Sequence, residues 1–172
     1  MSQLSLFDDH AASKISEPAA PEARRFSIVP MYTLKLEHKG DYPTGERIQV
    51  RSPDEVAVLF YEYFKDKPRE EFFIVLLNTA NVVIGIVQIS AGGLSASIVE
   101  PRAVFAAAMD GNAASIIAVH NHPSLNREPS REDIRITRQL TDAGKIMGIP
   151  VHDHVIIAGT TFTSLAERGL MQ

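Results

Sequence analysis

The sequence contains no cysteine. Disulfide bonds, thiolate zinc sites and a cysteine nucleophile are therefore all excluded. The zinc-dependent deaminases are excluded for the same reason, because their metal site needs a Pro-Cys-x-x-Cys ligand pair. The absence of cysteine thus removes several enzyme classes at once.

Long apolar runs and an excess of basic charge are also missing. No stretch is long or apolar enough to span a bilayer, and the N-terminus lacks the basic region and hydrophobic segment of a secretory signal. We therefore expect a cytoplasmic protein with no membrane contact. The net charge of -4 gives no bulk electrostatic reason to bind nucleic acid. A chain of 172 residues can form one well-filled domain plus a tail.

Two histidines stand at the end of a short apolar segment. Residues 114–119 are rich in β-branched side chains and are followed by a polar loop, a pattern that predicts a buried strand. His120 and His122 are two residues apart, so on an extended segment their side chains point to the same side. Both imidazoles can therefore reach one ion.

A helix is predicted from Arg131 to Met147 by the spacing of its apolar residues. Ser130 is a suitable N-cap, and acidic residues occupy the first turn. The predicted core-facing stripe consists of Asp133, Ile136, Thr137, Leu140, Ala143 and Met147. A carboxylate on such a stripe needs a partner, because an unpaired buried charge is costly.

His120, His122 and Asp133 together form the ligand set of a catalytic zinc site, with the fourth position left for water. Bound zinc lowers the pKa of such a water to about 7, so hydrolytic chemistry at neutral pH is indicated. Each part also has a simpler explanation, since Ser130 and Asp133 match a helix capping box and His-x-His occurs without any metal. The conjunction of both patterns in a strand, loop and helix favours the metal site.

The sequence motifs of this region resemble those of a known family. His-x-His-Pro followed after seven residues by Ser-x-x-Asp resembles the JAMM (MPN+) metalloprotease motif. HNHPS, PSREDI and the later Asp153-His154 pair resemble the RadC family in particular. The resemblance extends from about residue 69 to residue 170 and includes REEFFIVLLN, VEPRAVFAAA and SLAERGL, so it does not depend on one short motif.

The resemblance implies an α/β fold related to the cytidine deaminases, here a single JAMM-type domain with a mixed sheet flanked by helices. It implies that His120, His122 and Asp133 bind Zn2+ and that Ser130 supports the tetrahedral intermediate. A glutamate on an early strand would act as general base on a peptide or isopeptide substrate. The expected protein is therefore a zinc-dependent peptidase or isopeptidase linked to DNA replication or repair.

Two glutamates compete for the role of general base. On an extended strand the side chain of Glu70 points to the same face as that of Phe72, whereas the side chain of Glu71 points to the opposite face with that of Phe73. The sequence pattern of the family also favours Glu70, which we choose as the general base. The alternative is that both glutamates are ordinary solvated charges at the start of a strand.

The loop after the histidines departs from the family pattern. RadC relatives usually have Gly-Asp-Pro-Thr where this chain has Leu-Asn-Arg-Glu at residues 125–128, so we expect an altered loop beside the metal. Further on, His152 and His154 alternate along a strand predicted over residues 151–158 and should share one face. Because the Asp-His pair is part of the sequence pattern of the family, we expect His154 to support the site and His152 to have no role in it.

The N-terminus carries a second recognisable pattern. Gln3-Leu4-Ser5-Leu6-Phe7 resembles the peptide with which bacterial proteins dock into the hydrophobic groove of the replication sliding clamp. Residues 11–25 are rich in Ala, Pro, Glu and Ser, which is typical of a linker. We therefore expect a disordered tail over residues 1–25 and the hydrolase domain over residues 26–172. The alternatives are that these apolar side chains pack on the domain or that the match is accidental.

The remaining pattern predicts the other parts of the sheet and its helices. Residues 26–50 are strand-like, a helix begins after Ser52, and residues 72–77 and 82–89 form a hairpin. A further helix is predicted from Pro101 to Met109.

Two other functions remain open on the sequence. The clamp-like peptide favours a non-catalytic DNA-repair accessory with a structural zinc, and a metal-dependent nuclease would also use a zinc-activated water. The HNH string does not favour the nuclease, since HNH nucleases are named for residues dispersed through a ββα motif. A basic strip beside the site is usually the solvated face of an amphipathic helix. It would also suit an acidic peptide or a phosphate backbone, and the sequence does not decide between them. The strip consists of Arg127, Arg131, Arg135 and Arg138.

Overall fold

The computed structural model describes residues 48–92 and 99–172. Within them the elements follow the order α1 (Pro53–Phe64), β1 (Glu71–Leu77), β2 (Val83–Ala91), α2 (Pro101–Asp110), β3 (Ser115–Asn121), α3 (Arg131–Met147), β4 (Val151–Ala158) and β5 (Thr161–Ser164). The expected α/β fold with a mixed sheet is confirmed. The predicted tail over residues 1–25, its clamp-like peptide and the strand-like residues 26–47 lie outside the described residues.

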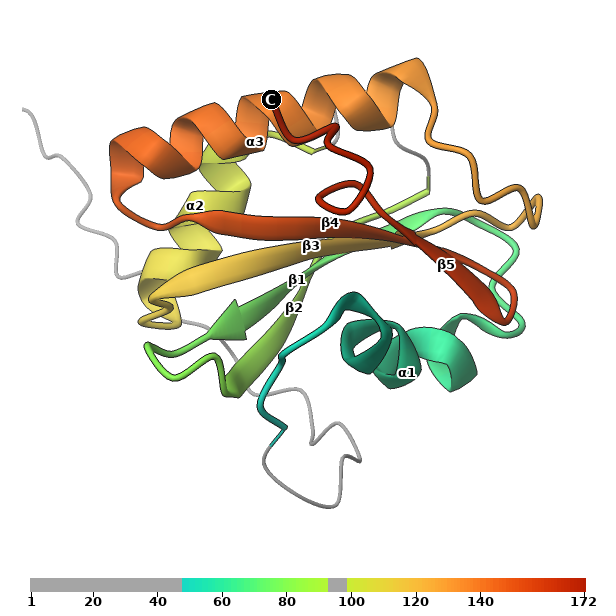
Figure 1. Cartoon of the computed structure of the whole chain (residues 1–172), viewed down its shortest axis with the longest axis horizontal. Helices are drawn as coiled ribbons and strands as arrows, with labels where there is room; N and C mark the ends of the chain where they lie inside the picture. Colours follow the sequence, from blue (N-terminus) through green and yellow to red (C-terminus); the bar gives the residue numbers. More distant parts are fainter. Residues whose placement is uncertain (1–47, 93–98) are drawn as a thin grey trace, which may run out of the picture. The chain divides into compact units, whose positions relative to one another are not determined.

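The strands form one sheet in the order β2-β1-β3-β4-β5 (Figure 1). β1 is antiparallel to both β2 and β3, β3 is parallel to β4, and β4 is antiparallel to β5. The parallel pair requires a crossover connection, which contains α3. β3 is thus the central strand, and every residue in it is buried. The strand that carries His120 is therefore held on both sides.

Helices cover both faces of the sheet (Figure 1). On one face α1 places Phe60 against Phe73 of β1, with ring centroids 5.5 Å apart. On the other face α2 and α3 bring Phe105 and Ile136 into a cluster with Phe72. Successive residues of β1 therefore belong to two different cores, as the period of two requires.

The helix predicted from Arg131 to Met147 is α3, with the predicted bounds. Its apolar stripe differs from the prediction at the C-terminal end, where Met147 is 43% exposed. Gly144 is buried there instead, and a Cβ atom on it would come within 2.6 Å of the carbonyl oxygen of Ile149. The chain returns so closely past the helix that no side chain fits at this position.

The prediction that His152 and His154 share one face of β4 is wrong. Consecutive residues of β3 pair with Val151 and Asp153, so β4 carries one extra residue at His152. An extra residue of this kind breaks the alternation of side chains along a strand. His152 is consequently exposed, whereas His154 is fully buried.

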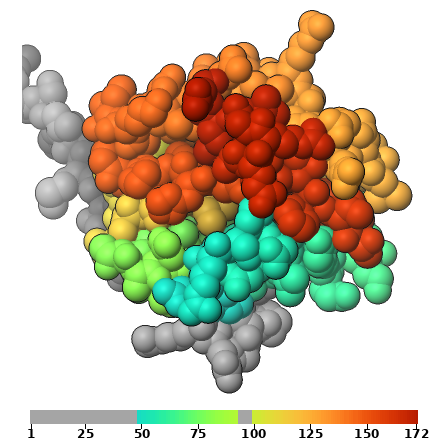
Figure 2. Space-filling view, viewed as in Figure 1, coloured from blue at the N-terminus to red at the C-terminus, as the bar shows by residue number. Residues whose placement is uncertain are grey.

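The C-terminal residues lie against α3. Figure 2 shows them in dark red beside the orange helix, and Met171 packs on the apolar cluster of that face. None of the helices in the described part of the chain combines the length and the apolar character that a bilayer crossing requires.

Candidate metal centre

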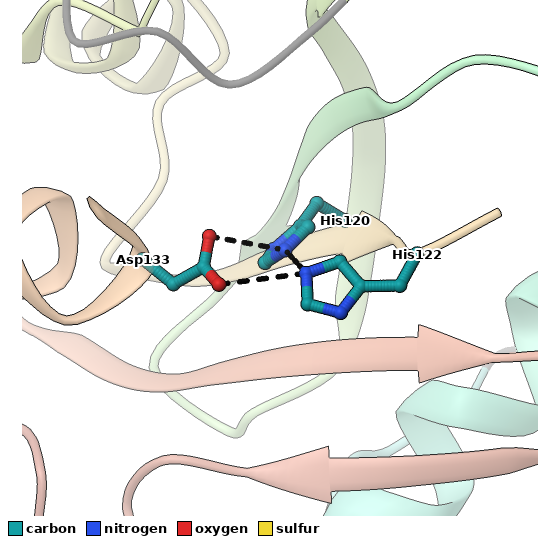
Figure 3. A group of neighbouring side chains, drawn as sticks. All are labelled: His120, His122 and Asp133. Carbon is teal, nitrogen blue, oxygen red and sulfur yellow. Dashed lines mark hydrogen bonds and ion pairs between the residues drawn. The ribbon is translucent and has the colours of Figure 1, made fainter. Parts of the chain in front are cut away.

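The two histidines at the end of β3 converge on one point. His120 is fully buried, and His122 is 8% exposed one residue beyond the strand. Their Nε2 atoms lie 2.9 Å apart, and Figure 3 shows both rings turned toward the same carboxylate. The predicted common side of the two imidazoles is therefore present in the structure.

Asp133 completes the group from the first turn of α3. Its Oδ1 lies 3.3 Å from Nε2 of His120, and its Oδ2 lies 3.4 Å from Nε2 of His122 (Figure 3). One ligand atom from each residue can be chosen so that all lie within 4.8 Å of one another, which suits a single metal ion. Strand and helix thus bring together all three predicted metal ligands.

Ser130 fixes the direction of the Asp133 carboxylate. The backbone N–H of Ser130 donates to Oδ2 of Asp133 at 2.6 Å, and the N–H of Asp133 donates to Oγ of Ser130 at 3.1 Å. This is a complete capping box. The simpler explanation of the Ser-x-x-Asp pattern is therefore correct, and it also aims the carboxylate at the histidines.

One oxygen of Asp133 has no hydrogen-bond partner. Oδ1 is buried, in a side chain that is only 1% exposed. Leaving a buried charged acceptor unsatisfied costs on the order of 1–3 kcal/mol or more. A cation between Asp133 and the two imidazoles would supply the missing interaction, so the donor set fits a metal ion.

Burial and mutual contacts determine the charges in this group. Burial, and after it His154, lowers the pKa of His120 well below its usual value, and burial lowers the pKa of His154 to about 4. Burial also acts to lower the pKa of His122, but Asp133 and the carbonyl of Asn126 outweigh it and raise that pKa. Burial would raise the pKa of Asp133, yet His122 and His120 lower it. A metal ion would therefore meet an ionised carboxylate and displace any proton on His122.

The second nitrogen of each ring is hydrogen-bonded away from the centre. Nδ1 of His122 lies 2.6 Å from the carbonyl oxygen of Asn126, which can only accept, so Nδ1 carries a proton. Nδ1 of His120 lies 2.7 Å from Nε2 of His154. The expected support of the site by His154 thus takes the form of a direct contact with the candidate ligand His120.

The structure separates the two candidate general bases. Glu70 lines a cavity of about 350 Å3 together with His122 and Asp133. Glu71 is directed elsewhere, and Tyr63 and Gln88 donate to its carboxylate, each at 2.8 Å. Of these two glutamates, Glu70 is the one beside the candidate ligands, and its role as base stays a prediction.

Asn121 lies between the two histidines and holds the backbone on either side of Glu70. Its Oδ1 accepts from the N–H of Glu71 at 2.7 Å, and its Nδ2 donates to the carbonyl of Arg69 at 3.0 Å. Asn121 is not among the site residues predicted from the sequence. The pairing of β1 with β3 creates this contact, and no local pattern in the sequence could have indicated it.

The altered loop after the histidines is tied to the C-terminal segment. Arg168 donates two hydrogen bonds to Glu128, at 2.7 and 2.9 Å. Leu125 adopts a φ of 63°, the left-handed region that favours glycine. Where the family pattern has glycine, this chain therefore has a leucine in a strained backbone conformation beside the site.

The chain matches the family model of the RadC-like JAB domain over residues 50–170. It belongs to the RadC-like JAB domain family. This match confirms the resemblance noted in the sequence, and the buried histidines and aspartate give this JAB domain a candidate metal site.

Several relatives of this JAB domain carry the name UPF0758 protein. The one from Salinibacter ruber is 60% identical over 126 residues, which cover 73% of this chain and 54% of the relative. The one from Desulforamulus reducens is 47% identical over 129 residues, covering 75% of this chain and 57% of the relative. The one from Clostridium kluyveri is 37% identical over 166 residues, covering 96% and 72%. The chain thus spans about half the length of the first two relatives.

Proposed function

We propose that this protein is a zinc-dependent hydrolase that cleaves peptide or isopeptide bonds. The observation that carries the proposal is the convergence of two ring nitrogens and an unpartnered carboxylate oxygen beside a polar cavity. Membership of the RadC-like JAB domain family supports it. Two imidazoles and one carboxylate suit zinc and leave one position free for a further ligand, which is the pattern of catalytic zinc sites.

The proposed mechanism assigns a task to each residue around the cavity. When bound, zinc would act as a Lewis acid and lower the pKa of a water to about 7. Glu70 takes a proton from the attacking water, whose oxygen forms a bond to the carbonyl carbon. As the carbon–nitrogen bond breaks, Glu70 passes that proton to the leaving amine.

In the proposed mechanism Ser130 stabilises the negative charge that develops on the carbonyl oxygen. Its Oγ accepts the N–H of Asp133, so the hydroxyl proton can be donated to a group in the cavity. Asn121 keeps the backbone around Glu70 fixed relative to the histidines on the neighbouring strand. The chain therefore offers a base and an oxyanion donor beside the candidate metal ligands.

The first test is the zinc content per chain in protein purified without added metal. We expect zinc in wild type and in Glu70→Ala, because Glu70 lies outside the ligand set, and none in Asp133→Ala. If none of the three proteins binds zinc even when it is supplied, the proposed hydrolase fails. If only Asp133→Ala lacks zinc, the ligand assignment holds and Glu70 is free to act as the base.

The second test concerns the bond that is cleaved. The wild-type protein is incubated with a mixture of peptides and lysine-linked isopeptides, and the products are identified by mass spectrometry. We expect new amine and carboxylate ends that are absent with Glu70→Gln, although this variant still binds zinc. Products that persist with Glu70→Gln would come from a contaminating enzyme and would contradict the assignment.

We separately propose that Gln3-Leu4-Ser5-Leu6-Phe7 recruits this protein to the replication sliding clamp. The support is the sequence of the peptide, with a glutamine for oriented hydrogen bonds and apolar anchors next to it. The test is a pull-down of purified bacterial clamp by the full chain and by a variant with alanine at Leu6 and Phe7. Equal recovery of clamp by both proteins would remove this proposal without affecting the hydrolase.

A further inference from the structure

A continuous line of buried hydrogen bonds runs from His120 back to the helix that carries Asp133. Nδ1 of His120 lies 2.7 Å from Nε2 of His154, and Nδ1 of His154 lies 2.6 Å from Oγ1 of Thr137. The hydroxyl of Thr137 in turn donates to the backbone carbonyl of Asp133 at 2.6 Å. His120, His154 and Thr137 are all fully buried, so solvent does not compete for these bonds.

The chemistry of the last partner sets the direction of every bond in this line. A carbonyl oxygen only accepts, so the single hydroxyl proton of Thr137 points to Asp133. The oxygen of Thr137 must then accept from Nδ1–H of His154, which leaves Nε2 of a neutral His154 without a proton. That Nε2 accepts from Nδ1–H of His120.

The same logic reaches the candidate metal ligand. A neutral His120 with its proton on Nδ1 has a lone pair on Nε2, the atom that faces Asp133. We propose that Thr137 and His154 are positioning residues that hold His120 in the tautomer whose Nε2 can bind the metal. This inference rests on the metal site of the proposed function and adds the residues that prepare its first ligand.

The opposite arrangement shows why Thr137 matters. If His154 carried its proton on Nε2, it would donate to Nδ1 of His120, and the proton of His120 would move to Nε2. That tautomer has no lone pair directed at Asp133 and cannot bind the ion there. The hydroxyl of Thr137 selects between the two arrangements because it offers an acceptor to Nδ1–H of His154. Outer partners of this kind fix the tautomer and orientation of metal-bound histidines.

The alternative role of Thr137 is purely local. A threonine within a helix often donates its hydroxyl to the carbonyl four residues earlier and has no further task. Thr141 does this one turn later, donating to the carbonyl of Thr137 at 2.9 Å. Thr141→Val is therefore a matched control, since it removes the same type of bond from the same helix.

Zinc affinity of the full chain, measured by competition with a chelating dye, tests the proposal. We expect Thr137→Val to lower the affinity about tenfold, because loss of an outer partner typically costs about 10–100-fold. Thr137→Ser keeps the hydroxyl and should restore affinity close to wild type. Thr141→Val should bind zinc like wild type. If Thr137→Val binds zinc as tightly as wild type, or if Thr141→Val is weakened equally, the proposal is overturned.

The tautomers can be observed directly in the metal-free protein. Long-range proton–nitrogen NMR correlations should place the proton of His120 on Nδ1 in wild type and in Thr137→Ser, and partly on Nε2 in Thr137→Val. An unchanged tautomer in Thr137→Val would contradict the proposal. Neither readout uses hydrolysis, so a protein that binds zinc but cleaves nothing would refute the proposed hydrolase alone.

Discussion

Two of the described aspartates are buried, Asp153 on β4 and Asp133 in the first turn of α3, and their carboxylates have different partners. Asp153 accepts on both oxygens, from the hydroxyl of Ser164 and from two backbone N–H groups, at 2.6 to 2.9 Å. Asp133 accepts a single backbone N–H on Oδ2, and its Oδ1 has no hydrogen-bond partner, although it lies 3.3 Å from Nε2 of His120. Asp153 pairs with Ile117 of the α1 core, whereas Asp133 faces the candidate metal centre. The two carboxylates are thus similarly buried but differ in their hydrogen bonds.

The comparison shows how a carboxylate with a structural role differs from one that has an oxygen left for a metal ion. A buried charge whose acceptors are all satisfied stabilises the fold, while an unsatisfied acceptor lowers stability and is kept where it has a function. Two adjacent glutamates also lie in different surroundings, because Glu71 accepts from Tyr63 and Gln88 whereas Glu70 lines the cavity. For the two aspartates, the hydrogen bonds made by each oxygen therefore distinguish the roles better than burial does.

The largest expected effect is on stability after truncation of the satisfied aspartate. Asp153→Ala leaves two buried donors and one part-buried donor without an acceptor and should lower the free energy of unfolding by about 3–5 kcal/mol. Asp133→Ala removes one capping bond and the contacts of the carboxylate with the two imidazoles, so we expect a smaller loss of about 1–2 kcal/mol in metal-free protein. Urea unfolding of both variants in the presence of a chelator measures the difference. Equal losses would show that the two carboxylates play the same structural role.

The second effect is the stabilisation of the fold by zinc. Free zinc at one hundred times its dissociation constant should stabilise wild type by about 2.7 kcal/mol, because the ion binds only the folded state. For a protein of this size the melting temperature should rise by roughly 5–10 °C. Asp133→Ala should show no rise, and Asp153→Asn should keep it despite its lower starting stability. Thermal melting with and without zinc measures both, and a zinc-dependent rise in Asp133→Ala would contradict the ligand assignment.

The third effect separates the adjacent glutamates. Glu71→Gln weakens the hydrogen bonds from Tyr63 and Gln88 to a charged acceptor and should lower the free energy of unfolding by about 1–2 kcal/mol. Glu70→Gln should keep its zinc, because Glu70 lies outside the candidate ligand set. Urea unfolding combined with metal analysis checks both expectations. Loss of zinc in Glu70→Gln would instead make Glu70 a ligand.

The parts of the fold predicted correctly from the sequence are those with local causes. The bounds of α3 follow from an N-cap at Ser130 and a left-handed glycine, Gly148, at the other end, both of which act within a few residues. The convergence of His120, His122 and Asp133 follows from the alternation of side chains along one strand and from the first turn of one helix. These signals need no knowledge of distant neighbours.

The parts missed depend on pairing between distant segments. The side chain of His152 does not lie on the same face as that of His154, because the register between β3 and β4 shifts by one residue there. Asn121 acts on Glu70 only because β1 pairs with β3. Thr137 appeared in the sequence as one more position on a helical stripe, and its contact with His154 exists because β4 lies beside that helix. Such roles follow from tertiary packing, which a single sequence does not specify.

The smallest effect concerns the loop between the histidines and the helix, where Leu125 stands at a φ of 63° and is 69% exposed. Left-handed backbone costs a non-glycine residue about 1–2 kcal/mol, and glycine gives back about 0.5–1 kcal/mol through the greater entropy of its unfolded chain. Leu125→Gly should therefore raise the free energy of unfolding by less than about 1 kcal/mol. Leu125→Ala is the control, since it shortens the same side chain but keeps the strain and should give no gain. Precise urea titrations can separate the two, and equal stability of both variants would show that the backbone at this position is not strained. Zinc affinity should stay unchanged in both, because the contact that orients His122 is made by the backbone carbonyl of Asn126.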